Sequence, residues 1–80
     1  MKNDETMRLL HTLLEENSYK ALREEMIEQN EVDIAEFIGI LPKDKAAIVF
    51  RLLPKDLAAD VFSNLELEVQ ERLIHEFTDK

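Results

Sequence analysis

The sequence predicts an all-α domain of about six short helices. Written in lines of twelve residues, positions 33 to 77 repeat one pattern of apolar residues, and two lines end in Leu-Pro-Lys-Asp. A fixed period with apolar columns is typical of stacked units that cannot bury their apolar faces alone. The chain has one glycine, two prolines and no cysteine. This composition is too poor in turn-forming residues for an all-β fold, and it excludes disulfides and zinc–thiolate sites.

Length, hydropathy and charge limit the kinds of partner that we expect. The 80 residues, 45% of them hydrophobic, suffice for one small domain over residues 1–80. No apolar run approaches the roughly 20 residues that span a bilayer, and no signal peptide is recognisable. We therefore expect a cytoplasmic domain that does not insert into a membrane. The net charge of −8 repels phosphate backbones, so we expect no nucleic-acid partner.

Residues 1–32 predict a helical hairpin. Apolar residues recur at helical spacing in two segments, which Asn17 and Ser18 separate. Asparagine and serine favour caps over helix interiors, so one helix should end and another begin at this point. Because the connection is short, the two helices should pack in antiparallel orientation.

Residues 33–77 predict four short repeats of about twelve residues, each with one helix. Three kinds of column recur, namely small residues, apolar pairs and single large apolar residues. The columns are Ala35, Ala47 and Ala59; Phe37-Ile38, Val49-Phe50, Val61-Phe62 and Leu73-Ile74; and Leu41, Leu53, Leu65 and Phe77. We expect these columns to form the core, with the alanines allowing helices to approach closely.

Three residues predict where the repeat helices begin and end. Pro42 and Pro54 should each end a helix, because the residue before a proline disfavours the α region. Each proline also suits the first turn of the following helix, where its missing N–H costs nothing. Asp33 precedes the first apolar run of the repeats and should cap that helix by accepting a backbone N–H.

The second line of the repeat should be the centre of the domain. Residues 45–53 are apolar on nearly every face, and only Lys45 and Arg51 are charged. A helix that is apolar all round is normally covered on several sides. We expect helices 33–41 and 57–65 to be its neighbours.

The last helix departs from the repeat. Glu66 stands where earlier lines have proline, and Glu71 replaces the column alanine, so the apolar stripe is narrower. A terminal unit needs such a polar face, although an internal helix at a cut edge would look the same. Since Phe77 lies close to the end of the sequence, we favour the second alternative and expect a fragment of a longer chain.

Five short segments, in their order and spacing, resemble one protein family. They are Leu22-Arg23, Asp33-Ile34-Ala35-Glu36, Arg51-Leu52-Leu53-Pro54, Ala58-Ala59-Asp60-Val61 and Glu68-Val69-Gln70-Glu71. From about residue 8 to residue 77, the chain resembles the N-terminal cytosolic domain of the MgtE family of bacterial magnesium channels or transporters. The resemblance implies a right-handed, armadillo-like superhelix of short helices.

The resemblance also implies a function. In the MgtE family this domain precedes a pair of CBS domains and a transmembrane domain, and the parent protein is a homodimer. Magnesium bound between acidic faces of the N-terminal and CBS domains favours a closed pore, and the domains separate when cytosolic magnesium falls. The resemblance therefore implies a magnesium-sensing regulatory domain at the cytosolic face of the cell membrane, whose partners belong to the same parent chain.

The resemblance points to Asp60 as a metal ligand, because this residue matches an acidic position of the magnesium-bearing face. Asp56 lies one helical turn earlier, and Glu36 is equivalent to Asp60 two lines before. The implied Mg²⁺ site is weak and regulatory, and it is incomplete because the family's remaining N-domain acids lie beyond residue 80. The plain alternative is that these carboxylates only form a solvated face, with Asp56 favouring the start of its helix.

The residue types present argue against an enzyme. His11 and His75 lie at opposite ends of the chain, Ser18 and Ser63 have no nearby base, and there is no glycine-rich phosphate loop. One other class of function stays open, an armadillo-like protein-interaction module, either of the flagellar motor switch FliG kind or a stand-alone adaptor. A FliG-like module should carry motor-facing charged clusters and a Glu-His-Pro-Gln-like motif, and neither is present.

Overall fold

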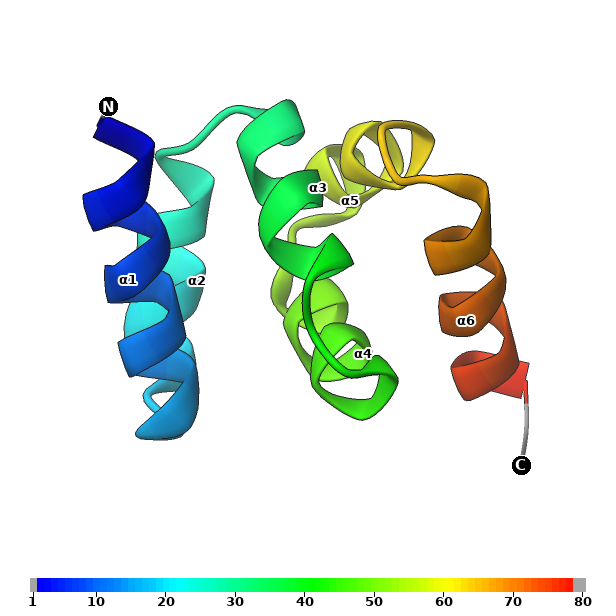
Figure 1. The fold of residues 1–80 in the computed structure, drawn as a ribbon, viewed down its shortest axis with the longest axis horizontal. Helices are drawn as coiled ribbons and strands as arrows, with labels where there is room; N and C mark the ends of the chain where they lie inside the picture. The colour runs from blue at the N-terminus through cyan, green and yellow to red at the C-terminus, as the bar shows by residue number, and fades with distance from the viewer. Residues whose placement is uncertain (1, 79–80) are drawn as a thin grey trace.

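The computed structural model describes residues 2–78 and the side chains of residues 4–78, and every regular element in that range is an α-helix. The helices are α1 (Lys2–Glu15), α2 (Tyr19–Ile27), α3 (Glu31–Gly39), α4 (Lys43–Leu52), α5 (Lys55–Ser63) and α6 (Leu67–Thr78) (Figure 1). The predicted all-α class with about six helices is confirmed, whereas the right-handed, armadillo-like superhelix stays a prediction. No helix among these residues is long and apolar enough to cross a membrane.

The first two helices form the predicted antiparallel hairpin (Figure 1). After α1 ends, Asn17 adopts the left-handed backbone conformation with a φ of 59°. Asparagine enters this region more readily than most residues with a side chain, so Asn17 can reverse the chain direction. The Tyr19 hydroxyl donates a hydrogen bond to Asn17 Oδ1 at 3.1 Å and holds the turn. The buried seam of the hairpin consists of Leu10, Leu14, Leu22 and Met26.

From α3 onward, helices pack mainly against the helix that lies two positions further along the chain. α3 contacts α5, and α4 contacts α6 as well as α2 and α3. Helix 57–65 was expected to be a neighbour of helix 45–53, and Phe62 of α5 does contact Phe50 of α4, but α6 packs more extensively against α4. The connection explains the difference: Leu53 and Pro54 are extended, with ψ values of 143° and 151°, so α5 leaves α4 instead of folding back along it.

Pro42 and Pro54 are N-cap residues, and the helices begin one residue after each proline. Their ψ values of 155° and 151° lie outside the helical region. Their carbonyl oxygens accept the first helical hydrogen bonds, from the N–H groups of Ala46 and Ala58 at 2.8 Å. The prediction that these prolines separate helices is confirmed, and their predicted place inside the first turn is wrong.

Asn30 caps α3, in place of the predicted Asp33. Its side-chain oxygen accepts the backbone N–H of Asp33 at 2.9 Å, and the helix begins at Glu31. Asn30 has the extended backbone of an N-cap residue, with φ −82° and ψ 165°. Asp33 lies inside the first turn, where its negative charge favours the positive end of the helix dipole. The first repeat helix therefore begins two residues before position 33.

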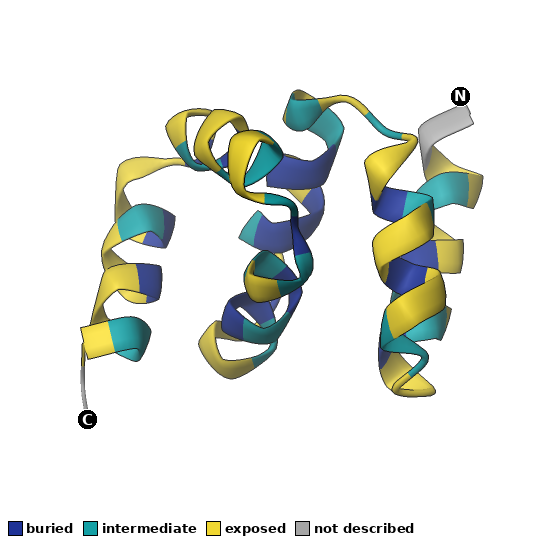
Figure 2. Cartoon of the chain, turned by 180° about the vertical axis from the view of Figure 1, so that it is seen from behind, coloured by how far each residue is buried: buried dark blue, intermediate teal, exposed yellow. Residues whose placement is uncertain are grey.

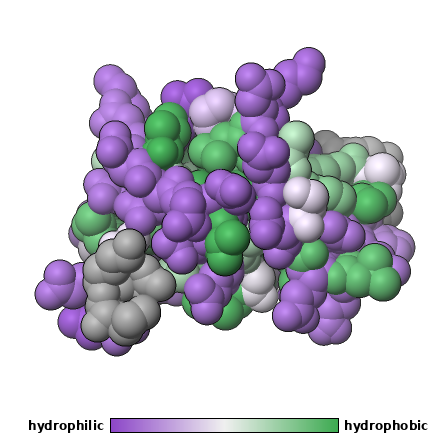
Figure 3. Space-filling model, turned by 90° about the horizontal axis from the view of Figure 1, so that it is seen from above, coloured by the Kyte–Doolittle hydropathy of each residue, from purple (hydrophilic) through white to green (hydrophobic). Residues whose placement is uncertain are grey.

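The core is deepest at α3 (Figure 2). Ile34, Phe37 and Ile38 are fully buried, while α4 buries fewer residues and leaves Arg51 exposed. The predicted centre at residues 45–53 agrees with the contacts of α4 to three other helices, although α3 is the more deeply buried of the two. The surface seen from above is mostly hydrophilic, with apolar residues in small separate patches (Figure 3).

Aromatic contacts and one hydrogen bond link the separate parts of the fold. The Phe50 ring lies edge-on to Phe62, with centroids 6.0 Å apart, and its centroid is 5.9 Å from that of Phe77. These contacts join α4, α5 and α6. Arg23 Nε on α2 donates a hydrogen bond to the carbonyl oxygen of Leu52 at 2.7 Å, which ties the hairpin to the end of α4.

Candidate functional site

Two of the three predicted metal ligands lie together on α5. Asp56 is in the first turn and Asp60 follows four residues later, and both residues are exposed. This spacing places them on one helix face. The carbonyl oxygen of Asp60 accepts hydrogen bonds from Ser63 Oγ at 3.0 Å and from Asn64 Nδ2 at 2.9 Å. These bonds close the C-terminal end of α5 through the backbone and leave the Asp60 carboxylate to the solvent.

Glu36, the third predicted ligand, lies apart from this pair. It is exposed on α3 and lines a groove between α3 and α6, which neither Asp56 nor Asp60 lines. Within residues 4–78, no group of three or more histidine, aspartate or glutamate side chains is placed to hold a metal ion. The structure therefore brings Asp56 and Asp60 to one face and does not add Glu36 to them.

The α5 pair fits one side of a magnesium site. Mg²⁺ prefers oxygen ligands, keeps several of its waters and often takes only one or two carboxylates from a protein. Two exposed carboxylates one helical turn apart satisfy that requirement for one side of the ion. Any further ligands would come from water or from residues outside the described part of this chain.

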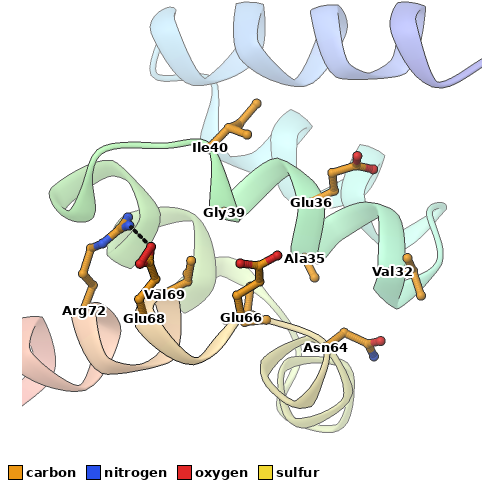
Figure 4. A pocket seen from close by; sticks show the side chains of 11 residues that line it. Val32, Ala35, Glu36, Gly39, Ile40, Asn64, Glu66, Glu68, Val69 and Arg72 are labelled. Atoms are coloured by element: carbon orange, nitrogen blue, oxygen red, sulfur yellow. Dashed lines mark ion pairs between the residues drawn. The ribbon is translucent and has the colours of Figure 1, made fainter.

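The groove beside Glu36 separates α3 from the α5–α6 connection and the first turns of α6, and it encloses about 450 Å³ (Figure 4). Its apolar lining consists of Val32, Ala35, Gly39, Ile40, Leu65 and Val69. Its polar lining consists of Glu36, Asn64, Glu66, Glu68 and Arg72. The guanidinium of Arg72 lies 3.9 Å from the Glu68 carboxylate, so the one cation of the lining faces one of its three acids.

Sequence reasoning missed this groove. Of its lining, sequence reasoning named Glu36 alone as a candidate functional residue, and for a different role. Val32 precedes the first repeat line, and Ile40 lies off the buried stripe of α3. An available signal was the position of Ile40 next to Gly39, the only glycine of the chain, just before Pro42. An apolar residue outside a helix stripe is either incidental or part of a second surface.

The two histidines occupy unrelated places. The His11 ring lies edge-on to Phe37, with centroids 5.0 Å apart, and it helps to pack α1 on α3. His75 is exposed on α6. Because they lie at opposite ends of the fold, the two histidines cannot bind one metal ion together.

Comparison with known proteins gives one match. A family model described as the MgtE intracellular N domain matches residues 29–80, which is more than half of the chain. No curated protein and no solved structure gives a significant match. The matched segment begins beside Asn30, the cap of α3, so it includes all the repeat helices and leaves out the hairpin. The chain therefore belongs to the family of the MgtE intracellular N domain, the N-terminal domain of a family of magnesium transporters.

Proposed function

We propose that this chain is a cytosolic regulatory domain that senses Mg²⁺ and gates a magnesium transporter by docking on the CBS domains of the same parent protein. The observation that carries the proposal is the exposed Asp56–Asp60 pair on α5, which lies inside the segment that matches the MgtE N domain. In a homodimeric parent, the domain would act at the cytosolic face of the membrane.

Charge supplies the physical basis for this docking. The chain has a net charge of −8, and acidic surfaces repel one another within about 10 Å at 0.1 M salt. A divalent cation held between two such surfaces replaces repulsion by attraction. Asp56 and Asp60 are available for this role, because the one ion pair found among residues 4–78 joins Arg72 to Glu68. Weak coordination suits a sensor, since the ion must leave when its concentration falls.

A magnesium titration followed by NMR tests the binding step. In the 80-residue chain, we expect amide signals around Asp56 and Asp60 to shift with an affinity on the order of millimolar or weaker, because only one side of the site is present. Sodium chloride at matched ionic strength and calcium chloride serve as salt controls.

Two double variants, each of which replaces two carboxylates by neutral amides, sharpen the titration. Asp56→Asn/Asp60→Asn should lose the local shifts. Glu24→Gln/Glu28→Gln removes two exposed acids with the same spacing, one on α2 and the other at its C-cap, and should keep the local shifts. Shifts that sodium reproduces, or that survive in the α5 variant, would mean charge screening in place of a site.

The sequence of the parent gene beyond residue 80 tests the docking step. A CBS pair and transmembrane segments encoded beyond residue 80 would support regulation of a transporter. A gene without them would favour a protein-interaction module that acts on its own.

A further inference from the structure

We propose that the groove between α3 and α6 is a docking site for a basic amphipathic helix of a partner protein. The groove combines apolar walls with an acidic rim (Figure 4). This surface is separate from the Asp56–Asp60 face, so the proposal goes beyond magnesium sensing and does not depend on it.

Exposed apolar side chains give the groove its capacity to bind. Val32 and Ile40 are 55% and 63% exposed, although both are large apolar residues. Burial of such surface is the dominant favourable contribution to most protein association. Val32, Glu36 and Ile40 follow one another at four-residue spacing along α3, over about 12 Å. An amphipathic helix presents its anchors at i, i+3, i+4 and i+7, over a similar length.

The negative charge of the groove rim favours a basic helix as the bound partner. The rim carries three carboxylates, of Glu36, Glu66 and Glu68, and one guanidinium, of Arg72, which leaves a net charge of −2. Arg72 already faces Glu68 at 3.9 Å. A helix with lysine and arginine beside its apolar anchors complements this rim, whereas an acidic segment is repelled. A second copy of this chain is disfavoured for the same reason, because each copy carries a net charge of −8.

Gly39 keeps the floor of the groove open. It is the last residue of α3 and its φ is not positive, so the backbone does not require glycine at this position. A Cβ atom added to Gly39 would meet Val69 Cγ2 at 4.0 Å, an ordinary van der Waals contact. Alanine would therefore fit and would favour the helix, whereas a longer side chain would enter the groove. Residue 39 is thus a position at which the groove can be filled without overpacking the core.

The test uses the 80-residue chain and two synthetic helical peptides of about 14 residues. Both peptides carry leucine anchors on one face; one has lysine and arginine on its flanks, and the other has glutamate at the same positions. In EDTA, which removes any effect of magnesium, we expect the basic peptide to shift the amide signals of Val32, Gly39, Ile40 and Val69. The acidic peptide should bind at least about tenfold more weakly.

Filling the groove should abolish the interaction. Gly39→Leu should weaken binding of the basic peptide by at least about tenfold, while Gly39→Ala should stay within about twofold. Ala59→Leu adds the same side chain at an exposed position of α5 outside the groove and should bind like the unchanged chain. A thermal melt of each variant confirms that it is folded.

Reversing the rim charge tests the electrostatic part. Glu36→Lys/Glu66→Lys should weaken binding by about tenfold. Glu24→Lys/Glu28→Lys changes the net charge equally on α2 and its C-cap, away from the groove, and should weaken binding much less. Equal binding of both peptides, unchanged binding by the Gly39→Leu chain, or shifts centred outside the groove would overturn the proposal. Dimerisation of the chain through the same residues would also overturn it, because the occupant would then be a second copy.

Discussion

Ala47 and Ala59 occupy the same column of the repeat and have different surroundings. Ala47 is buried on α4, which contacts α2, α3 and α6. Ala59 is exposed on α5, whose main partner among the described helices is α3. The prediction of a continuous buried alanine column is therefore wrong at Ala59. A residue's burial depends on how many helices cover it, and the twelve-residue pattern does not contain that information.

Enlarging these two alanines should have unequal effects. Ala47→Leu should overpack the core and lower the free energy of unfolding by about 1 to 3 kcal/mol. For a domain of this size, that corresponds to a fall in melting temperature of at least about 4 °C. Ala59→Leu should change the free energy of unfolding by no more than about 0.5 kcal/mol. Circular dichroism melts measure both, and equal melting temperatures would remove Ala47 from the core.

Helix boundaries show which part of the fold the sequence can predict at the scale of an element. The apolar stripe of α3 and the two prolines correctly located helices and their ends, because both signals act within a few residues. The start of α3 was misplaced because Asn30 and Asp33 are both suitable caps, and only the backbone conformation distinguishes them. The larger contact of α4 with α6 was not predicted, because the extended Leu53-Pro54 connection sets the direction of α5 and local patterns do not show where α6 then packs.

Removing the cap of α3 should destabilise the domain. Asn30→Ala removes the side-chain oxygen that accepts the Asp33 N–H at 2.9 Å, and it should cost about 1 kcal/mol. Asp33→Ala keeps that backbone N–H and should cost less, because only a dipole interaction is lost. Urea unfolding with an unchanged m-value measures both. A larger loss for Asp33→Ala would make Asp33 the effective cap.

The candidate site was predictable to a similar extent. Asp56 and Asp60 share a helix face because they are four residues apart, which the sequence shows directly. Glu36 is equivalent to Asp60 by repeat position, but it lies on another helix, beside a groove that Asp60 does not line. Equivalence within a repeat therefore does not imply a shared site, because each repeat helix presents its outward position to different surroundings.

At the scale of the whole molecule, the two candidate surfaces differ in their chemistry. The α5 face consists of exposed carboxylates, and the α3–α6 groove adds exposed apolar side chains to its acidic rim. A cation suits the first surface, and a basic amphipathic segment suits the second. Variants at Asp56 and Gly39 therefore address the two interactions independently.

The pairing of helices two positions apart also affects how quickly the chain reaches its native state. The strongest contacts join α1 to α2, α4 to α6, α3 to α5, α3 to α4 and α2 to α4, so no helix depends mainly on a distant part of the sequence. Proteins dominated by such local contacts fold in about microseconds to milliseconds. Temperature-jump relaxation should therefore finish within milliseconds, whereas a main phase of seconds would contradict it. A chain with this topology can begin to fold at the hairpin or at the repeats, because each region finds its main partners nearby in the sequence.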